Sequence, residues 1–89
     1  MTFEYDENKS KTNKEKHGID FVEAEGLWLH NHVLYPARSE FENRYALIGE
    51  LSGRIYTCIY TLRGNNTRII SCRIARDGER SLYEQSIRT

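Results

Sequence analysis

Residues 42–75 read ENRYALIGELSGRIYTCIYTLRGNNTRIISCRIA, and this stretch decides the fold. Its polar and apolar side chains alternate with a period of two, and Ile, Tyr and Thr are frequent, which is typical of β-strands. Two groups of turn-forming residues, Ser52-Gly53 and Gly64-Asn65-Asn66, divide it. The stretch therefore predicts three strands, over 42–50, 54–62 and 68–75, which two hairpin turns join into an antiparallel meander.

The two hairpins determine which residues of neighbouring strands lie opposite each other. A first turn centred on Ser52-Gly53 sets three pairs: Tyr45 with Tyr60, Leu47 with Cys58 and Gly49 with Tyr56. An odd-length second turn centred on Asn65 sets three more: Tyr56 with Ile74, Cys58 with Cys72 and Tyr60 with Ile70. Because successive strand residues point to opposite sides, one face collects the predicted core: Tyr45, Leu47, Tyr56, Cys58, Tyr60, Leu62, Ile70, Cys72 and Ile74.

The opposite face of the meander carries charge. The same registers place Glu42 opposite Arg63, Arg44 opposite Thr61, and Thr57 opposite Arg73, with Ser71, Ala46, Ile48 and Ile59 among them. One carboxylate and three arginines on an open sheet face are more than solvation requires, so this face is a candidate binding surface for an anion. The alternative is an ordinary exposed cross-strand ion pair between Glu42 and Arg63, worth about 0.2–1 kcal/mol.

Helical segments precede the meander. Asp6 is the predicted N-cap of a helix over 7–17, and Gly18 follows as the left-handed residue that ends it. This helix has no apolar residue, so it is either solvated or in contact with something charged. A second helix starts after Asp20, which forms a capping box with Glu23, and its apolar face contains Phe21, Ala24 and Trp28.

A last helix is predicted over 78–86 with Asp77 as its N-cap, and short strands over 3–5 and 33–35 complete the list of elements. Together they predict an α+β fold: an antiparallel β-sheet meander with two N-terminal helices and one C-terminal helix. The length of 89 residues favours a single domain over residues 1–89.

The formal net charge of zero conceals a gradient along the chain. Residues 18–50 hold two arginines against six acids, a net charge of −4, whereas residues 51–89 hold seven arginines against three acids, a net charge of +4. The planar guanidinium of Arg grips phosphate or carboxylate at two points. The C-terminal half therefore predicts an anionic partner, either a nucleic acid or an acidic protein.

The composition also indicates the compartment. No apolar run approaches the roughly 20 residues of a membrane helix, and the first residues lack the order of a signal peptide. We expect a cytoplasmic protein that does not engage a membrane. Cys58 and Cys72 lack metal-ligand spacing and are expected to be reduced and buried, and His30 and His32 lack a third ligand, so neither a metal nor another cofactor is expected.

Several short motifs, taken in order, resemble the BrnT toxin family. They are Phe3-Glu4-Tyr5-Asp6 with Asn8-Lys9, Lys16-His17-Gly18-Ile19-Asp20-Phe21, Glu42-Asn43-Arg44-Tyr45, the run from Arg68 to Ala75, and Glu79-Arg80 with Tyr83. The resemblance implies a RelE-like fold and the toxin half of a bacterial type II toxin–antitoxin pair, which cleaves RNA and inhibits translation. It also implies a BrnA-type antitoxin, and contact with operator DNA only through the antitoxin complex.

Metal-independent RNA cleavage needs a group that accepts the 2′-OH proton, a group that protonates the 5′-oxygen, and cations that neutralise the phosphorane. The predicted cations are Arg44, Arg63 and Arg73, with Glu42 as an available base. His17, whose ordinary pKa suits proton transfer, is the predicted acid, with a helix cap or plain surface residue as its alternative. Tyr83 is a second proton donor, with helix packing as its alternative, and the predicted phosphate contacts are Lys9, Lys16, Arg68 and Arg80.

Two classes of function remain open from the sequence. In the first, the chain is an endoribonuclease toxin and the arginine face is its active site. In the second, the chain is a non-catalytic interaction module that binds an antitoxin-like partner and acts in transcriptional autoregulation.

Overall fold

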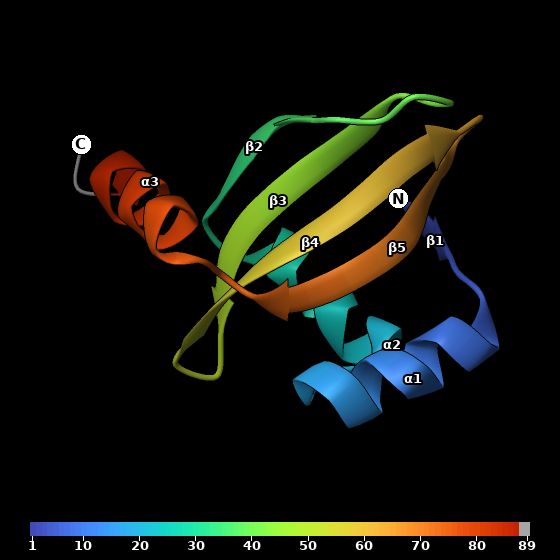
Figure 1. The fold of residues 1–89 in the computed structure, drawn as a ribbon, viewed down its shortest axis with the longest axis horizontal. Helices are drawn as coiled ribbons and strands as arrows, with labels where there is room; N and C mark the ends of the chain where they lie inside the picture. The colour runs from blue at the N-terminus through green and yellow to red at the C-terminus, as the bar shows by residue number, and fades with distance from the viewer. Residues whose placement is uncertain (88–89) are drawn as a thin grey trace.

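One mixed β-sheet organises residues 1–87, the part of the chain that the computed structural model describes (Figure 1). Its five strands in residues 1–87 lie in the order β1-β5-β4-β3-β2. The elements are β1 Thr2–Glu4, α1 Glu7–His17, α2 Phe21–Ala24, the 3₁₀-helix η1 Glu25–Leu29, β2 His32–Ala37, β3 Arg44–Leu51, β4 Arg54–Arg63, β5 Asn66–Ile74 and α3 Asp77–Ile87. Strands β2 to β5 form the predicted antiparallel meander, and β1 adds a parallel partner to β5. The sheet is therefore mixed, because the long segment between β1 and β5 brings the two strands together in the same direction.

The first hairpin has the predicted register, but the second contains a β-bulge. Cys58 lies opposite Cys72 as predicted, whereas a register shift between Ile59 and Tyr60 places Tyr60 opposite Ile69 and not Ile70. A bulge inserts one extra residue into one strand, so the odd residue lies in β5 and not in the turn. As a consequence Ile69 is buried at 2% exposure and replaces Ile70 in the core.

The prediction that Leu62 and Ile74 belong to the core is also wrong. Leu62 and Ile74 are 57% and 39% exposed. Both lie near the ends of their strands, outside the group of buried residues that packs under α2 and η1. This first core cluster consists of Ile19, Phe21, Ala24, Leu27, Leu47, Tyr56, Cys58, Tyr60, Ile69 and Cys72.

The second N-terminal helix is shorter than a full amphipathic helix. The predicted capping box of Asp20 and Glu23 is present, but α2 changes after one turn into the 3₁₀-helix η1. A 3₁₀-helix has three residues per turn, so Leu27, three residues after Ala24, lies on the same buried side of the chain. Trp28, which was predicted on that line, is only partly buried and packs edge-on against Phe3 and Tyr60.

The polar helix α1 is attached to the sheet by hydrogen bonds and not by apolar packing. Asp6 caps its start, and Gly18 ends it with a φ of 76°. The buried Asn13 amide donates to Cys72 O at 2.8 Å and to Ile19 O at 2.7 Å, and its oxygen accepts from Cys72 N at 3.2 Å. Strand β1 pairs with β5 only as far as Arg68. Beyond that point the Asn13 side chain hydrogen-bonds the edge N–H and C=O of Cys72, as a neighbouring strand would.

Helix α3 covers one end of the second sheet face, the face opposite the first core cluster. Tyr83 of α3 forms a second core cluster with Ile48 and Ala75, against which Val33, Tyr35 and Ile55 pack. This end of the face was predicted to be open and is not, because the two residues between β5 and α3 return the chain across the sheet. Within residues 1–87, none of the helices has the length and apolar content to cross a membrane.

Candidate functional site

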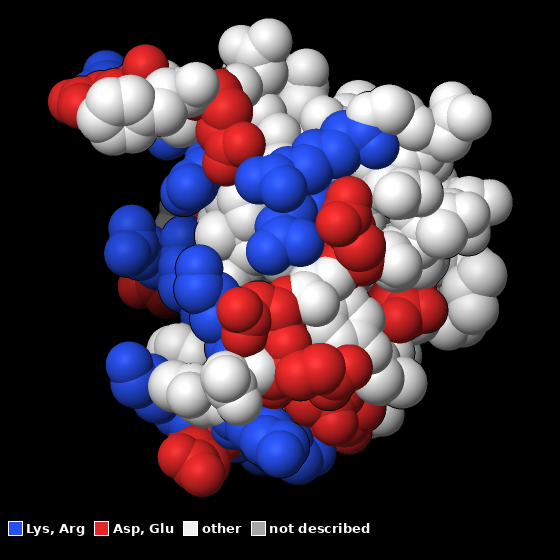
Figure 2. All heavy atoms as spheres, turned by 90° about the vertical axis from the view of Figure 1, so that its right-hand side faces the viewer, with Lys and Arg blue, Asp and Glu red and all other residues white. Residues whose placement is uncertain are grey.

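The second sheet face carries a row of polar residues at the end away from α3. The registers place Arg44, Thr61, Arg68 and Glu4 side by side on β3, β4, β5 and β1. The Arg68 guanidinium lies 3.2 Å from the Glu4 carboxylate. In Figure 2, which views the molecule from the side of β1, Lys and Arg side chains gather in the left-hand half with acidic groups beside them. This surface is basic but partly neutralised.

The predicted pair of Glu42 and Arg63 is not formed. Strand β3 begins at Arg44, so Glu42 lies in the preceding loop, where its carboxylate accepts from Arg44 Nε at 3.2 Å. Arg63 lies opposite Asn66 at the end of β4, is exposed and has no ion pair among residues 1–87. The two residues fail to meet because the ladder of β3 and β4 ends before the level of Glu42.

Arg73 belongs to a polar cluster at the boundary with α3, centred on Glu79. The guanidinium donates to both Glu79 oxygens, at 2.7 and 3.0 Å. Three more groups donate to the same carboxylate: Thr57 Oγ1 at 2.9 Å, the Tyr35 hydroxyl at 3.0 Å and the Arg76 N–H at 2.8 Å. Glu79 therefore accepts five hydrogen bonds from four residues.

The cluster perturbs the ionisation of its members. The hydrogen bonds from Arg73 lower the pKa of Glu79 from 4.5 to about 2, with smaller contributions from Arg76, Thr57 and Tyr35. Burial raises the pKa of Tyr35, and its hydrogen bond to Glu79 acts in the same direction. Because a carboxyl group of such low pKa is a weak base near neutral pH, Glu79 is suited to holding Arg73 and not to accepting a substrate proton.

Glu79 was not among the predicted site residues. The sequence contained one signal for it, since Glu is favoured at the third position of a helix. Helix α3 starts at Asp77, so Arg76 and not Asp77 is the N-cap, and Glu79 at the third position accepts from the Arg76 N–H. The prediction of Asp77 as the cap was wrong by one residue. The contacts of Glu79 with β2, β4 and β5 had no sequence signal.

A groove between α1 and β5 collects three of the predicted residues. Its volume is about 320 Å³, and it is lined by Asn8, Lys9, Thr12, Asn13, Lys16, His17, Ile70 and Ser71. Lys9, Lys16 and His17 share this side of α1 because residues seven or eight apart return to the same helix face. Ser71 also lies opposite Ile59 on the second sheet face. The groove therefore borders that face.

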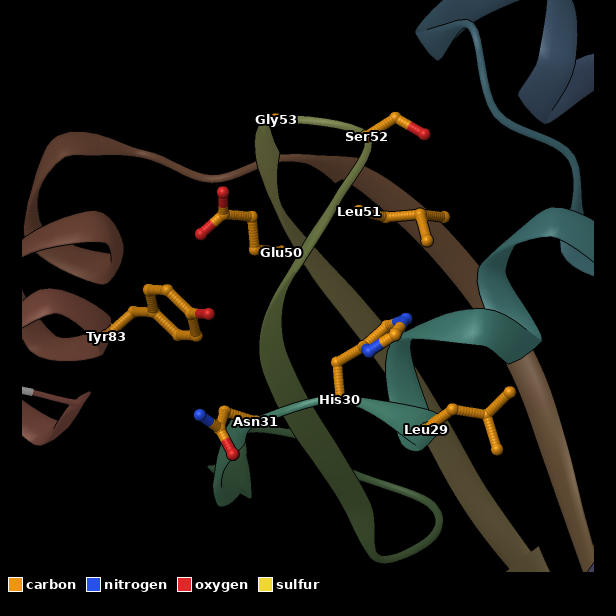
Figure 3. Close-up of a pocket in the computed structure, with 8 residues that line it drawn as sticks. All are labelled: Leu29, His30, Asn31, Glu50, Leu51, Ser52, Gly53 and Tyr83. Carbon is orange, nitrogen blue, oxygen red and sulfur yellow. The ribbon is translucent and has the colours of Figure 1, made fainter.

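Tyr83 and Arg80 lie apart from this groove. Tyr83 is only 4% exposed, in agreement with its packing alternative, and burial raises the pKa of its hydroxyl. Figure 3 shows its ring reaching from α3 toward β3, near Glu50, in a hollow that also includes His30. Arg80 is exposed on α3 and lines a different hollow with Arg54. Arg88, which contributes to the C-terminal positive charge, lies outside the described residues.

The cysteines and histidines form no metal centre within residues 1–87, where no group of three or more His, Cys, Asp or Glu side chains converges. Cys58 and Cys72 are buried free thiols, as predicted. The hydrogen bond between the two thiols, and then burial, raise the pKa of Cys58. These cysteines are core residues and not reactive groups.

The chain therefore combines a small α+β fold with an arginine-bearing sheet face and an adjoining groove lined by Lys9, Lys16 and His17. A family model described as the ribonuclease toxin BrnT of type II toxin–antitoxin systems matches residues 5–79, which is most of the chain. The chain belongs to the BrnT toxin family. Membership implies an RNA substrate and an antitoxin partner. A search of curated proteins found no match.

Proposed function

We propose that this chain is a toxin that cleaves RNA by a metal-independent mechanism and thereby inhibits translation. A BrnA-type antitoxin neutralises it, and the two together bind operator DNA. The observation that carries the proposal is the groove between α1 and β5, where His17, Lys9 and Lys16 lie together beside the arginine-bearing sheet face. The groove supplies cations for the RNA backbone next to an imidazole, the side chain that most often serves as a general acid or base.

In the proposed reaction the ribose 2′-oxygen bonds to phosphorus while the bond from phosphorus to the 5′-oxygen breaks. One group accepts the 2′-OH proton, and another donates a proton to the departing 5′-oxygen. We assign the donor role to His17 and propose Glu42 as the acceptor. Tyr83 ranks below both because it is buried.

The remaining predicted residues are assigned to the RNA backbone. Arg44, Arg63 and Arg73 are the proposed cations that stabilise the phosphorane, where charge grows in the transition state. The proposed contacts to flanking phosphates are Lys9, Lys16, Arg68 and Arg80. Of the four arginines on the second sheet face, which are Arg44, Arg63, Arg68 and Arg73, Arg63 is the one without an ion pair among residues 1–87, so it is the most accessible to a phosphate.

One observation favours the second function, a non-catalytic interaction module. Arg44, Arg68 and Arg73 each contact a carboxylate of the same chain. A face that has neutralised most of its own arginines is also suited to docking a protein partner, which can exchange ion pairs with it. In this alternative the output is transcriptional autoregulation through the antitoxin complex.

An RNA degradation assay with the purified chain tests the two functions. We expect His17→Gln to lower the rate of cleavage by at least about 10²-fold, the scale of losing a general acid. The matched control is His30→Gln, which changes an exposed histidine outside the groove. If the wild-type chain cleaves RNA and the two variants lose cleavage activity to the same extent, the role of His17 is contradicted. A folded wild-type chain that neither degrades RNA nor arrests growth when expressed alone contradicts the toxin function and supports the interaction module.

A further inference from the structure

We propose that Arg73, Thr57 and Tyr35 form a binding cradle for an RNA phosphate, and that the chain's own Glu79 carboxylate occupies it until RNA replaces it. This inference rests on the proposed function and adds to it an anion-binding site and its internal competitor. The donors are the two outer nitrogens of Arg73, the hydroxyls of Thr57 and Tyr35, and the Arg76 N–H.

The three side chains of the cradle come from three strands and not from the helix that fills it; only the Arg76 N–H lies at the start of that helix. Tyr35 is on β2, Thr57 on β4 and Arg73 on β5, whereas Glu79 is on α3. Thr57 is fully buried, and it lies directly opposite Arg73 in the ladder of β4 and β5. The backbone of the sheet therefore positions Thr57 and Arg73 whether or not Glu79 is present.

The number and type of donors fit a phosphate. A glutamate at the third position of a helix needs only one hydrogen bond, to the N-cap N–H, to stabilise the helix start. Glu79 receives four more from side chains, including a two-point contact with Arg73. Guanidinium binds phosphate and carboxylate with the same fork geometry, so a phosphate oxygen pair can take the place of the carboxylate.

The helix that carries Glu79 is lightly held. Tyr83 is its one buried residue within 77–87, and only two residues connect it to β5. In Figure 1 α3 lies beside the end of the sheet, apart from α1 and α2. Departure of the Glu79 carboxylate therefore disturbs few apolar contacts. Arg73 and Ser71 share the second sheet face, and Ser71 lines the groove of His17, so RNA in the groove can continue onto the cradle.

The test measures binding of a short single-stranded RNA with 2′-O-methyl groups, which block cleavage, over a range of NaCl concentrations. We expect Glu79→Gln to bind this RNA roughly tenfold more tightly than wild type, the scale of one charge-assisted contact. The logarithmic salt dependence should steepen by about 0.7, as for one added phosphate contact on a single strand. Adding Arg73→Ala to Glu79→Gln should abolish both changes.

Glu84→Gln is the matched control, because it removes the same charge from the same helix at a residue without an ion pair in residues 1–87. Inorganic phosphate should raise the thermal midpoint of Glu79→Gln more than NaCl of equal ionic strength does, and should act on wild type and Glu84→Gln like NaCl. If Glu79→Gln is unfolded without phosphate, we expect phosphate to refold it. Failure to refold overturns the cradle.

Equal RNA affinities of Glu79→Gln and Glu84→Gln, with no specific effect of phosphate, also overturn the cradle. That result leaves the proposed function intact when the wild-type chain cleaves RNA and His17→Gln does not. A wild-type chain that neither binds nor cleaves RNA counts against the proposed function itself, so the two failures are distinguishable.

Discussion

Asn13→Ala tests how α1 is attached to the sheet. The Asn13 amide makes three buried hydrogen bonds, to the N–H and C=O of Cys72 and to the C=O of Ile19. Alanine removes these bonds, and the three backbone groups then have no partner in the protein interior. Because the residue is 59 positions away from Cys72, the effect depends on the tertiary structure and not on the helix alone.

The expected magnitude follows from these contacts. A buried backbone group without a partner costs about 1–3 kcal/mol, and alanine returns about 0.5 kcal/mol through its higher helix propensity. Allowing for partial relaxation, we expect the free energy of unfolding to fall by about 3 kcal/mol. At roughly 4–8 °C per kcal/mol for a chain of this size, the thermal midpoint falls by about 12–24 °C.

Urea denaturation followed by the fluorescence of Trp28 measures this change. Trp28 is the single tryptophan, and its ring packs 5.2 Å from that of Tyr60, so its emission reports on the first core cluster. The control is Asn8→Ala, which removes the same amide from an exposed position of α1. Its expected change is within about 0.5 kcal/mol. If Asn13→Ala is as stable as Asn8→Ala, the amide does not hold α1 on β5.

Three further predictions concern the core and the candidate site. Cys58 and Cys72 should react with a thiol reagent only after unfolding, and rapid labelling in native buffer contradicts their placement opposite each other in the core. Glu79 should make the fold less stable as the pH is lowered. Its pKa is about 2 in the folded chain and 4.5 in the unfolded chain, so the ionised carboxylate stabilises the fold above pH 4.5, and this contribution is lost as the pH falls toward 2. Urea titrations should show that, between pH 5 and pH 2, the free energy of unfolding of wild type falls by about 2 kcal/mol more than that of Glu79→Gln, after allowance for solvent screening. If the free energies of the two proteins change in parallel with pH, Glu79 does not have this role. Arg63→Ala should lower RNA cleavage by about 10²-fold with stability unchanged within about 0.5 kcal/mol, because the side chain is exposed and has no ion pair in residues 1–87. If Arg63→Ala and Glu42→Gln both retain cleavage but lose antitoxin affinity, this face is a docking surface.

The groove and the cradle differ in how far they were predictable. Lys9, Lys16 and His17 were predicted separately, and one helix brings them together through its periodicity. Arg73 was predicted on the correct face, but its partner Glu79 was not, because Glu79 reaches the sheet from a helix whose path is determined by packing. The same path explains why Tyr83 is buried and lies apart from the groove.

The sequence by itself determined the helices α1 and α3, the four strands of the meander and the first hairpin. These features depend on turn residues, caps and periodicity, which act over a few residues and are visible in the linear order. Only the tertiary structure decided the bulge beside Ile70, the attachment of α1 through Asn13 and the convergence of Tyr35, Thr57 and Arg73 on Glu79. Asn13 and Cys72 are 59 residues apart, and Tyr35 and Glu79 are 44 apart. Such contacts form because buried polar groups must find partners wherever the folded chain brings them, and no local pattern specifies which partner that is.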